Sequence, residues 1–244
     1  MPLTEVTRRS VPDEVYEQIV SDVLHGNLAA GEALPSERRL AEVLGVSRPA
    51  VREALQRLTH SGVITVRQGD ATTVNDFRRH AGMDLLAHLL IRNGELDPAV
   101  ARSILEARLY IGPYVAELAA RRAGVELRPS LDAALAALRD GPDPVARQRA
   151  SLEYWDVIVD GADSITFRLM YNGLRGAYEP AQVALAPLLD AETSLDAYRR
   201  LATAITRAQP TSARRAADDL LRPGSVSLLA ALDALEALDT LEAP

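Results

Sequence analysis

The sequence contains neither cysteine nor lysine. Without a thiol, the chain cannot form a disulfide bond, a zinc–thiolate site, an iron–sulfur site or a cysteine nucleophile. All 27 of its basic side chains other than histidine are therefore arginine. A Schiff-base enzyme, including any that uses pyridoxal phosphate, needs a lysine amine. These two absences exclude several large classes of enzyme.

The sequence also lacks a long apolar run. No stretch approaches the roughly 18 apolar residues that are typical of a membrane-spanning helix. Residues 1–10 do not have the apolar core of a secretory signal. We therefore expect a cytoplasmic protein that does not associate with a membrane.

Acidic side chains outnumber basic ones over the whole chain, but arginine is concentrated in one segment. The 244 residues carry a formal net charge of −7, and 48% are hydrophobic and 25% charged, which is ordinary for a globular protein. Within residues 36–68, however, six arginines stand against three glutamates. Nucleic-acid binding depends on the local distribution of charge, so this segment predicts a basic surface on an acidic protein.

The first part of the chain has the pattern of a small helical domain with one β-hairpin. The expected helices, each delimited by a capping residue or a glycine, cover residues 12–25, 36–44 and 47–61. Residues 63–67 and 71–74 are rich in β-branched side chains and flank a Gly69-Asp70 turn. Two short helices joined by a tight turn and followed by a hairpin are typical of a winged helix-turn-helix.

The helix expected at 47–61 has two different sides. With about 100° of rotation per residue, the side that must face a core holds Val51, Ala54, Leu55 and Leu58. Another side holds Arg48, Pro49, Arg52 and Gln56. Two arginines four residues apart present planar forks to guanine edges or phosphates, and the helix N-terminus adds backbone donors. The alternative is an ordinary solvated face, on which Arg52 pairs with Glu53 or Gln56.

The rest of the chain is rich in alanine and leucine and indicates one helix after another. After a linker at 75–82, the expected helices cover residues 82–93, 97–123, 130–139, 144–160, 164–188, 194–208, 211–221 and 225–241. Glycine and proline mark the expected breaks, at Asn93-Gly94, Gly124, Arg128-Pro129, Gly141-Pro142, Gly161, Pro210 and Pro223-Gly224. The prediction is a mainly α protein, with a winged helix-turn-helix domain at 1–76 and an antiparallel all-helical bundle at 77–244. The apolar tail at 228–241 fits core packing or a dimer surface.

The segment LPSERRLAEVLGVSRPAVREALQRLTHSGVITVRQG, from Leu34 to Gly69, resembles the N-terminal domain of the GntR family of bacterial transcription regulators. The resemblance implies that the DNA contacts come from Arg38, Arg48 and Arg52 and from a wing tip at Gln68 and Gly69. Ser47 and Pro49, at the start of the same helix, complete the candidate set. Fatty-acid-responsive members of the family have a His-Gly wing tip, and they have threonines where Pro49 and Ala50 stand. These departures bear on which bases are read and leave the docking mode unchanged.

Two further segments, TTVNDFRRHAGMDLL and LMYNGLRGAYEP, are similar to the FadR-like subgroup of that family. This likeness implies an all-helical effector domain and a homodimer. Many members of the subgroup bind a divalent metal through an acid and three histidines, whereas no histidine of this chain follows His88. Asp156 stands where a histidine ligand is usual. We therefore expect a domain without metal or cofactor.

Polar and aromatic residues that interrupt apolar helix faces are candidates for an effector pocket. The candidate set is Arg108, Tyr114, Trp155, Tyr171, Asn172 and Tyr178. An arginine directed into an apolar bundle would pair with a carboxylate, a thioester carbonyl or a phosphate, so we expect an acyl-CoA or a small organic acid as effector. Arg108 leads the set because it matches an arginine in the effector domain of the fatty-acid regulators. The alternative is structural, with arginines paired to acids such as Asp156 or Glu179.

The sequence therefore predicts a ligand-responsive regulator, acting as a repressor. Its homodimer would bind a palindromic double-stranded DNA operator, and a small molecule would modulate that binding. An enzyme is not expected, because the chain lacks cysteine, lysine, a late histidine and a Gly-x-Ser-x-Gly motif. Two alternatives stay open: a helical hydrolase or transferase tethered to a DNA-binding domain, and an architectural DNA binder without an effector. An enclosed pocket of at least ~300 Å³ lined by arginine or tyrosine would favour the effector hypothesis.

Overall fold

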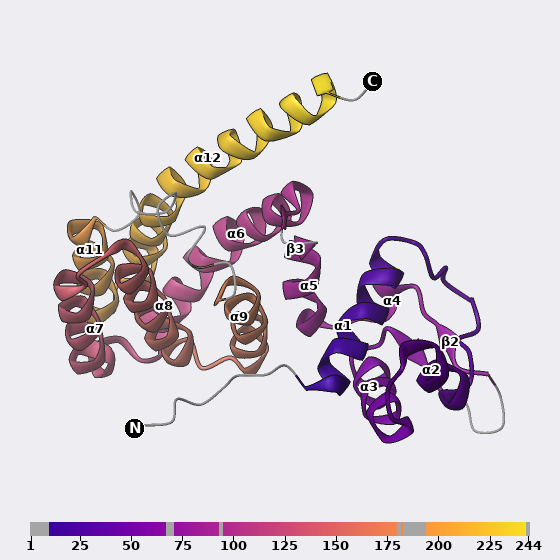
Figure 1. The fold of residues 1–244 in the computed structure, drawn as a ribbon. Helices are drawn as coiled ribbons and strands as arrows, with labels where there is room; N and C mark the ends of the chain where they lie inside the picture. Colours follow the sequence, from indigo (N-terminus) through magenta and orange to yellow (C-terminus); the bar gives the residue numbers. More distant parts are fainter. Residues whose placement is uncertain (1–9, 67–70, 93–94, 180–181, 183–193, 243–244) are drawn as a thin grey trace, which may run out of the picture. The chain divides into compact units, whose positions relative to one another are not determined.

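The computed structural model of the chain describes residues 10–66, 71–92, 95–179, 182 and 194–242. The chain forms two compact units, Met1–Arg92 and Asn93–Pro244 (Figure 1). In its described residues the first is a small helical unit with a two-stranded sheet, and the second is helical apart from a two-residue strand near its start. The expected fold class is therefore confirmed.

Three helices form the frame of the first unit. Its elements in chain order are α1 (Val11–Leu24), α2 (Glu37–Leu44), α3 (Arg48–His60), β1 (Ile64–Thr65), β2 (Thr73–Val74), α4 (Phe77–His80), the 3-10 turn η1 (Met83–Leu85), α5 (Leu86–Leu90) and β3 (Ile91–Arg92). Serine caps each of the three long helices: the hydroxyls of Ser10, Ser36 and Ser47 accept hydrogen bonds from backbone N–H groups in the first turn. The predicted positions of the caps at Ser36 and Ser47 are confirmed.

The core of this unit is built from the apolar side of α3. Val51, Ala54 and Leu58 have no exposed surface, and they pack with buried side chains of α1 such as Val15 and Ile19. The two-sided character that the sequence predicts for this helix is thus confirmed. Burial of this side leaves the opposite, arginine-bearing side at the surface.

A short antiparallel sheet follows α3. Ile64 pairs with Val74 and Thr65 with Thr73, so the strands are shorter than the predicted 63–67 and 71–74. Gly62 leads into β1 at φ +74°, and a Cβ there would lie 2.2 Å from the carbonyl oxygen of His80. Only glycine fits that close approach. The predicted wing tip at Gln68 and Gly69 lies outside the described residues.

The segment after the hairpin belongs to the first unit. The predicted linker at 75–82 contains the four-residue helix α4, and Leu85, which is 1% exposed, is part of the hydrophobic core formed with α1 and α3. The units divide after Arg92, whereas the domain boundary expected from the sequence lies after residue 76. The helix predicted at 82–93 is wrong in its last part, because α5 ends at Leu90 and Ile91–Arg92 is extended.

The second unit is a bundle of long helices. Its described elements are the strand β4 (Glu95–Leu96), α6 (Pro98–Arg122), the 3-10 turn η2 (Gly124–Leu127), α7 (Arg128–Asp140), α8 (Pro144–Gly161), α9 (Ile165–Tyr178), α11 (Leu195–Thr206) and α12 (Pro210–Glu242). Helix α12 runs along α6, and α7, α8 and α11 complete the core (Figure 1). At its centre Tyr154 is fully buried, with its ring edge-on to that of Tyr198 and its hydroxyl donating to the Tyr198 carbonyl oxygen at 3.0 Å.

Three predicted boundaries in this unit differ from the structure. The break predicted at Arg128-Pro129 is wrong, because α7 begins at Arg128 and includes both residues. The break predicted at Pro223-Gly224 is wrong, because α12 continues through both residues. A proline inside a helix removes one backbone hydrogen bond and crowds the preceding turn. Here the helix buries Leu220 and Leu221 before the proline and Leu228 and Leu232 after it, and this packing favours continuity. Helix α9, predicted to extend to residue 188, ends at Tyr178, and most of the residues beyond lie outside the described part.

Candidate DNA interface and effector region

The exposed side of α3 carries a row of long polar side chains. Arg48, Arg52 and Gln56 follow one another at intervals of four residues, and all three are exposed. Among the described residues, Arg48 has no hydrogen-bond or ion-pair partner. Pro49 occupies the first turn and is also exposed, and the Ser47 hydroxyl accepts from the Ala50 N–H at 3.4 Å. This arrangement leaves the long donors of Arg48 and Arg52 at the N-terminal end of the helix. The Ala50 and Val51 N–H groups are already bonded to Ser47 and Pro49 has none, so the side chains provide most of the donors there.

Arg52 is held by an acid from the neighbouring helix. Its Nε donates to both carboxylate oxygens of Glu37, each at 3.3 Å, and its Nη2 donates to Oε2 at 2.9 Å. These hydrogen bonds lower the pKa of the Glu37 carboxyl and raise that of Arg52. The alternative in which Arg52 pairs with Glu53 or Gln56 is wrong, because its partner is Glu37. The role of Glu37 as the partner of Arg52 is not predictable from the sequence, because a contact between two helices has no signal in the local pattern.

Two other basic residues of the segment have different surroundings. Arg38 is paired within α2 to Glu42 at 3.2 Å, and its side chain is 72% exposed. Arg57, by contrast, forms an ion pair with Asp13 of α1 and lies over the ring of Tyr16, with its Cζ 4.5 Å from the ring centroid. Arg38 is therefore accessible from solvent, whereas Arg57 ties α3 to α1.

The predicted effector residues lie on three helices of the second unit. Tyr114 of α6 is 42% exposed and packs edge-on against Phe167 of α9. Tyr171 donates its hydroxyl to the Leu152 carbonyl oxygen at 2.6 Å. The hydroxyl of Tyr178 lies 3.4 Å from Gln148 Oε1. Arg108 is half-buried on α6, and Asn172 is exposed.

Trp155 differs from these residues in its burial. It is 8% exposed, and its indole N–H has no hydrogen-bond acceptor among the described residues. The same is true of the hydroxyl of Ser225, which is fully buried on α12. Gly112 packs closely against this region, because a Cβ added there would lie 3.6 Å from the Trp155 ring and 2.5 Å from the Leu221 side chain. Buried polar groups in proteins are normally paired, so both groups have capacity for a ligand or a water.

The two arginines of α9 direct their donors at acidic side chains. Arg175 donates to Glu153 at 2.7 Å, to Glu179 at 2.8 Å and to Asp156 at 3.2 Å. Arg168 pairs with Asp156 as well. These two residues therefore fit the alternative in which arginines pair with acids inside the protein, since their donors are directed at acids of α8 and at Glu179, which follows α9.

Asp156, at the position where the family's metal-binding members have a histidine, is thus held by two arginines. Within the described part of the chain, no three histidine, aspartate or glutamate side chains come together as a metal site.

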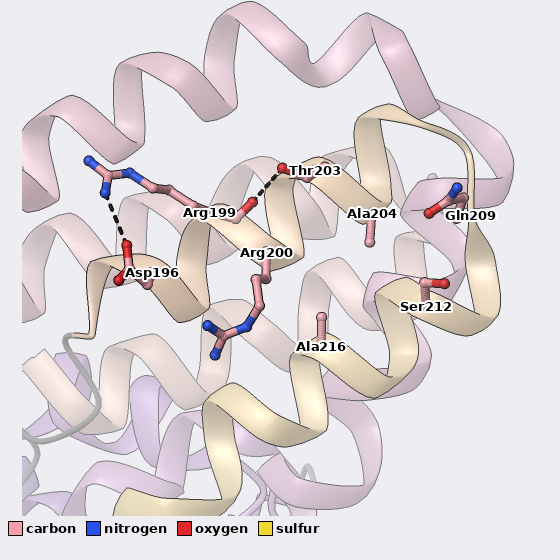
Figure 2. Close-up of a pocket in the computed structure, with 8 residues that line it drawn as sticks. All are labelled: Asp196, Arg199, Arg200, Thr203, Ala204, Gln209, Ser212 and Ala216. Atoms are coloured by element: carbon pink, nitrogen blue, oxygen red, sulfur yellow. Dashed lines mark hydrogen bonds and ion pairs between the residues drawn. The ribbon is translucent and has the colours of Figure 1, made fainter.

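Two grooves lie elsewhere in the bundle. One of about 560 Å³ runs between α11 and α12, and Figure 2 shows Arg200 extending toward α12 while Arg199 turns to Asp196. The other, of about 540 Å³, lies between α6 and α12 beside Tyr110 and Arg215. None of the six predicted effector residues lines either groove.

Comparison with known proteins decides the family. The profile described as "Bacterial regulatory proteins, gntR family" matches residues 12–74, and that of the FCD domain matches residues 103–223. The chain is 59% identical over 233 residues to the HTH-type transcriptional regulator Mce2R of Mycobacterium tuberculosis (strain CDC 1551 / Oshkosh), covering 95% of this chain and 97% of that protein. The chain belongs to the GntR family of bacterial regulatory proteins.

Other relatives place this GntR regulator near regulators of fatty-acid metabolism. It is 29% identical over 164 residues to the fatty acid metabolism regulator protein of Edwardsiella ictaluri (strain 93-146), which covers 66% of each chain. A solved structure titled for Lar, which controls the Listeria monocytogenes agr system, shares the fold with a TM-score of 0.59 at 15% identity, over 91% of this chain and 98% of that one.

Family membership settles the broad class of activity. The protein is a DNA-binding transcriptional regulator with an FCD effector-binding domain, and its relatives are regulators and not enzymes. The alternative of a tethered hydrolase or transferase is therefore wrong. The described helices include none that is both long and apolar enough to span a membrane.

Proposed function

We propose that this regulator is a repressor whose homodimer binds a palindromic operator and responds to a small organic anion. The observation that carries the DNA-binding part is the exposed row on α3, which lies opposite a fully buried apolar side. A helix with this division can enter the major groove with its first turns while its other side stays in the core. An operator-binding protein of a bacterium acts in the cytoplasm.

The proposed DNA contacts divide into two kinds. Arg48 and Arg52 have the reach and the planar donors to read guanine edges. Arg38, Ser47 and the backbone N–H of Arg48 suit hydrogen bonds to the phosphate backbone. Pro49 would lie against the backbone without donating, and Gln68 and Gly69 at the wing tip would contact the DNA beside it. A dimer would place two such helices on half-sites about 34 Å apart, which requires a symmetric operator.

DNA binding is proposed for residues 1–76, and effector binding and dimerisation for residues 77–244. We expect the effect of a ligand to be transmitted through residues 75–92, which join the hairpin to the second unit. A ligand releases DNA only if it binds the non-DNA-binding arrangement more tightly than the other.

The effector is proposed to be an acyl-CoA or a small carboxylate. Support comes from the N–H of Trp155 and the hydroxyl of Ser225, which are buried without a partner among the described residues and could each donate to a carboxylate or a thioester carbonyl. Arg108, Tyr114, Tyr171, Asn172 and Tyr178 make up the rest of the proposed site. The name of the Edwardsiella relative, a fatty acid metabolism regulator, is consistent with a ligand of this chemistry.

A thermal-shift screen of acyl-CoAs and carboxylates tests this proposal. A ligand at 100 times its Kd stabilises the protein by about 2.7 kcal/mol. The ligand found should then release the protein from DNA, and Arg108→Ala should abolish that release while leaving DNA affinity nearly unchanged. If no compound shifts the unfolding temperature, the effector-free architectural binder is the better description. If Arg108→Ala loses DNA binding instead, Arg108 is structural.

A further inference from the structure

Glu37 and Arg52 join the two helices of the helix-turn-helix. Glu37 is the first residue of α2, and Arg52 lies in the second turn of α3. Their side chains are 33% and 60% exposed, so the pair lies at the surface. Three hydrogen bonds connect them, all from the Nε and Nη2 atoms of Arg52.

The carboxylate occupies only one edge of the guanidinium group. A guanidinium has five N–H donors arranged in a fixed plane. Glu37 takes the edge formed by Nε and Nη2, so the edge formed by Nη1 and Nη2 keeps hydrogens that point away from the carboxylate. A guanine offers O6 and N7 in the major groove, and an arginine edge with two parallel donors matches them. Arg52 can therefore bind Glu37 and a guanine at the same time.

The ion pair itself adds little to stability, since water screens it and two long side chains must be ordered. An acid in the first turn of α2 does favour that helix, but this effect does not need a partner on α3. A negative charge beside a DNA-binding surface also weakens attraction to phosphates. The role that fits the geometry is to fix the direction of Arg52. An arginine that is already ordered loses less conformational freedom when it binds a base.

We propose that Glu37 is a positioning residue for sequence recognition, which holds Arg52 in the orientation that reads a guanine and lowers affinity for DNA of other sequences. This inference rests on the proposed function of α3 as the recognition helix. It assigns to Glu37 a role in specificity and gives it no contact with DNA.

The experiment compares Glu37→Gln with Glu53→Gln in the full-length chain. Glu53 is an exposed acid on the same helix as Arg52, so both variants lose one negative charge near the same surface. The probes are a duplex selected by the unmodified protein from a random-sequence pool and a scrambled duplex of the same composition. In Glu37→Gln the ratio of the two affinities should fall about tenfold, as for the loss of one guanine contact. Glu53→Gln should raise both affinities alike and keep the ratio within about twofold.

A double-mutant cycle shows whether Glu37 acts through Arg52. In an Arg52→Ala background, Glu37→Gln should leave the affinity ratio unchanged. If the ratio falls there as much as it does in the parent, Glu37 acts on the fold and the proposal is overturned. It is overturned equally if Glu37→Gln and Glu53→Gln behave alike. If Arg52→Ala and Arg48→Ala alone leave the ratio at its parental value, the assignment of the recognition helix has failed, which is a separate result.

Discussion

Arg52 in the first unit and Arg168 in the second both bind acidic side chains, but they differ in what they leave open. Arg52 is 60% exposed, meets one carboxylate, and keeps one edge of its guanidinium free. Arg168 is 22% exposed and donates to Asp156 and Asp160 and to the Asp156 carbonyl oxygen at 2.9 Å. The first arrangement suits a residue that binds another molecule, and the second suits one that holds two helices together.

This difference explains how a chain with a net charge of −7 binds DNA. The arginines of α9 are neutralised by acids of α8 and by Glu179 at the end of α9, so they add little to the electrostatic field beyond the bundle. On α3, Arg48 is exposed and has no ion-pair partner in the described part of the chain. The number of arginines in each half of the sequence is therefore a poor guide to where an anion binds, and the partners of each arginine are a better one.

The largest effect is expected in the core of the second unit. Tyr154→Ala should lower the free energy of unfolding of this unit by about 3–5 kcal/mol, because it removes a fully buried ring and its hydrogen bond. Tyr110→Ala, at a tyrosine 82% exposed in the same unit, is the control and should change little. The single tryptophan, Trp155, gives a fluorescence signal from this unit alone in urea unfolding. If both variants lost the same free energy of unfolding, burial of the tyrosine ring would not be the cause of the stabilisation.

Arg48→Ala and Arg168→Ala test the comparison of the arginines directly. Arg48→Ala should weaken operator binding by about 1–3 kcal/mol and leave the unfolding curve unchanged. Arg168→Ala should lower the free energy of unfolding, because the half-buried Asp156 loses one of its two arginine partners. It should leave the affinity for the operator unchanged. Operator titration and Trp155 fluorescence measure the two effects in each variant. A loss of operator binding in Arg168→Ala would contradict the distinction.

The sequence predicted the parts of the structure that depend on local pattern. The division of α3 into a buried and an exposed side follows from helical periodicity, and the serine caps follow from the chemistry of helix ends. The strand at Ile91–Arg92 also had a local signal, because an Asn-Gly pair follows it and favours strands on both sides. The leucine-rich run before it predicts a helix through residue 93, so two local signals compete here, and the structure follows the turn signal.

Features that depend on tertiary contact had no such signal. The continuation of α12 through Pro223 results from packing on both sides of the proline, which outweighs a local preference. The pairing of Glu37 with Arg52 spans 15 positions and two helices. The acids of α8 that pair with Arg168 and Arg175 follow from the placement of α8 beside α9, whereas Glu179, four residues after Arg175, is a local partner.

A smaller effect is expected at the helix caps. Ser47→Ala should destabilise the first unit by about 1 kcal/mol, because the Ala50 N–H loses its acceptor. Ser164, which precedes α9, makes no capping hydrogen bond with its side chain. Ser164→Ala should therefore change the stability of the second unit by no more than a few tenths of a kcal/mol. Thermal unfolding followed by circular dichroism measures both, and a larger loss at Ser164 would reverse the expected order.

The smallest effect concerns the loss of stability at acidic pH. Asp13 accepts hydrogen bonds from Ser10 and from Arg57 of another helix, and these lower its pKa below the ordinary value of 3.8. Arg139 lowers the pKa of Asp140 in the second unit in the same way, but the two residues are neighbours in the chain. A lowered pKa in the folded state means that the unfolded state binds more protons, so the stabilisation is present above pH 3.8 and is lost as the pH falls through the folded value.

The two acids should nevertheless differ in their effect on stability. Arg139 stays close to Asp140 when the chain unfolds, whereas Arg57 moves away from Asp13. The pKa of Asp13 should therefore change more on unfolding than that of Asp140. We expect Asp13→Asn to flatten the acid dependence of stability in the first unit, and Asp140→Asn to alter that of the second unit less. Amide hydrogen exchange of α1 and α7 between about pH 3 and 6 measures the two slopes separately. Equal flattening would show that the contact between α1 and α3 adds nothing beyond a local pair.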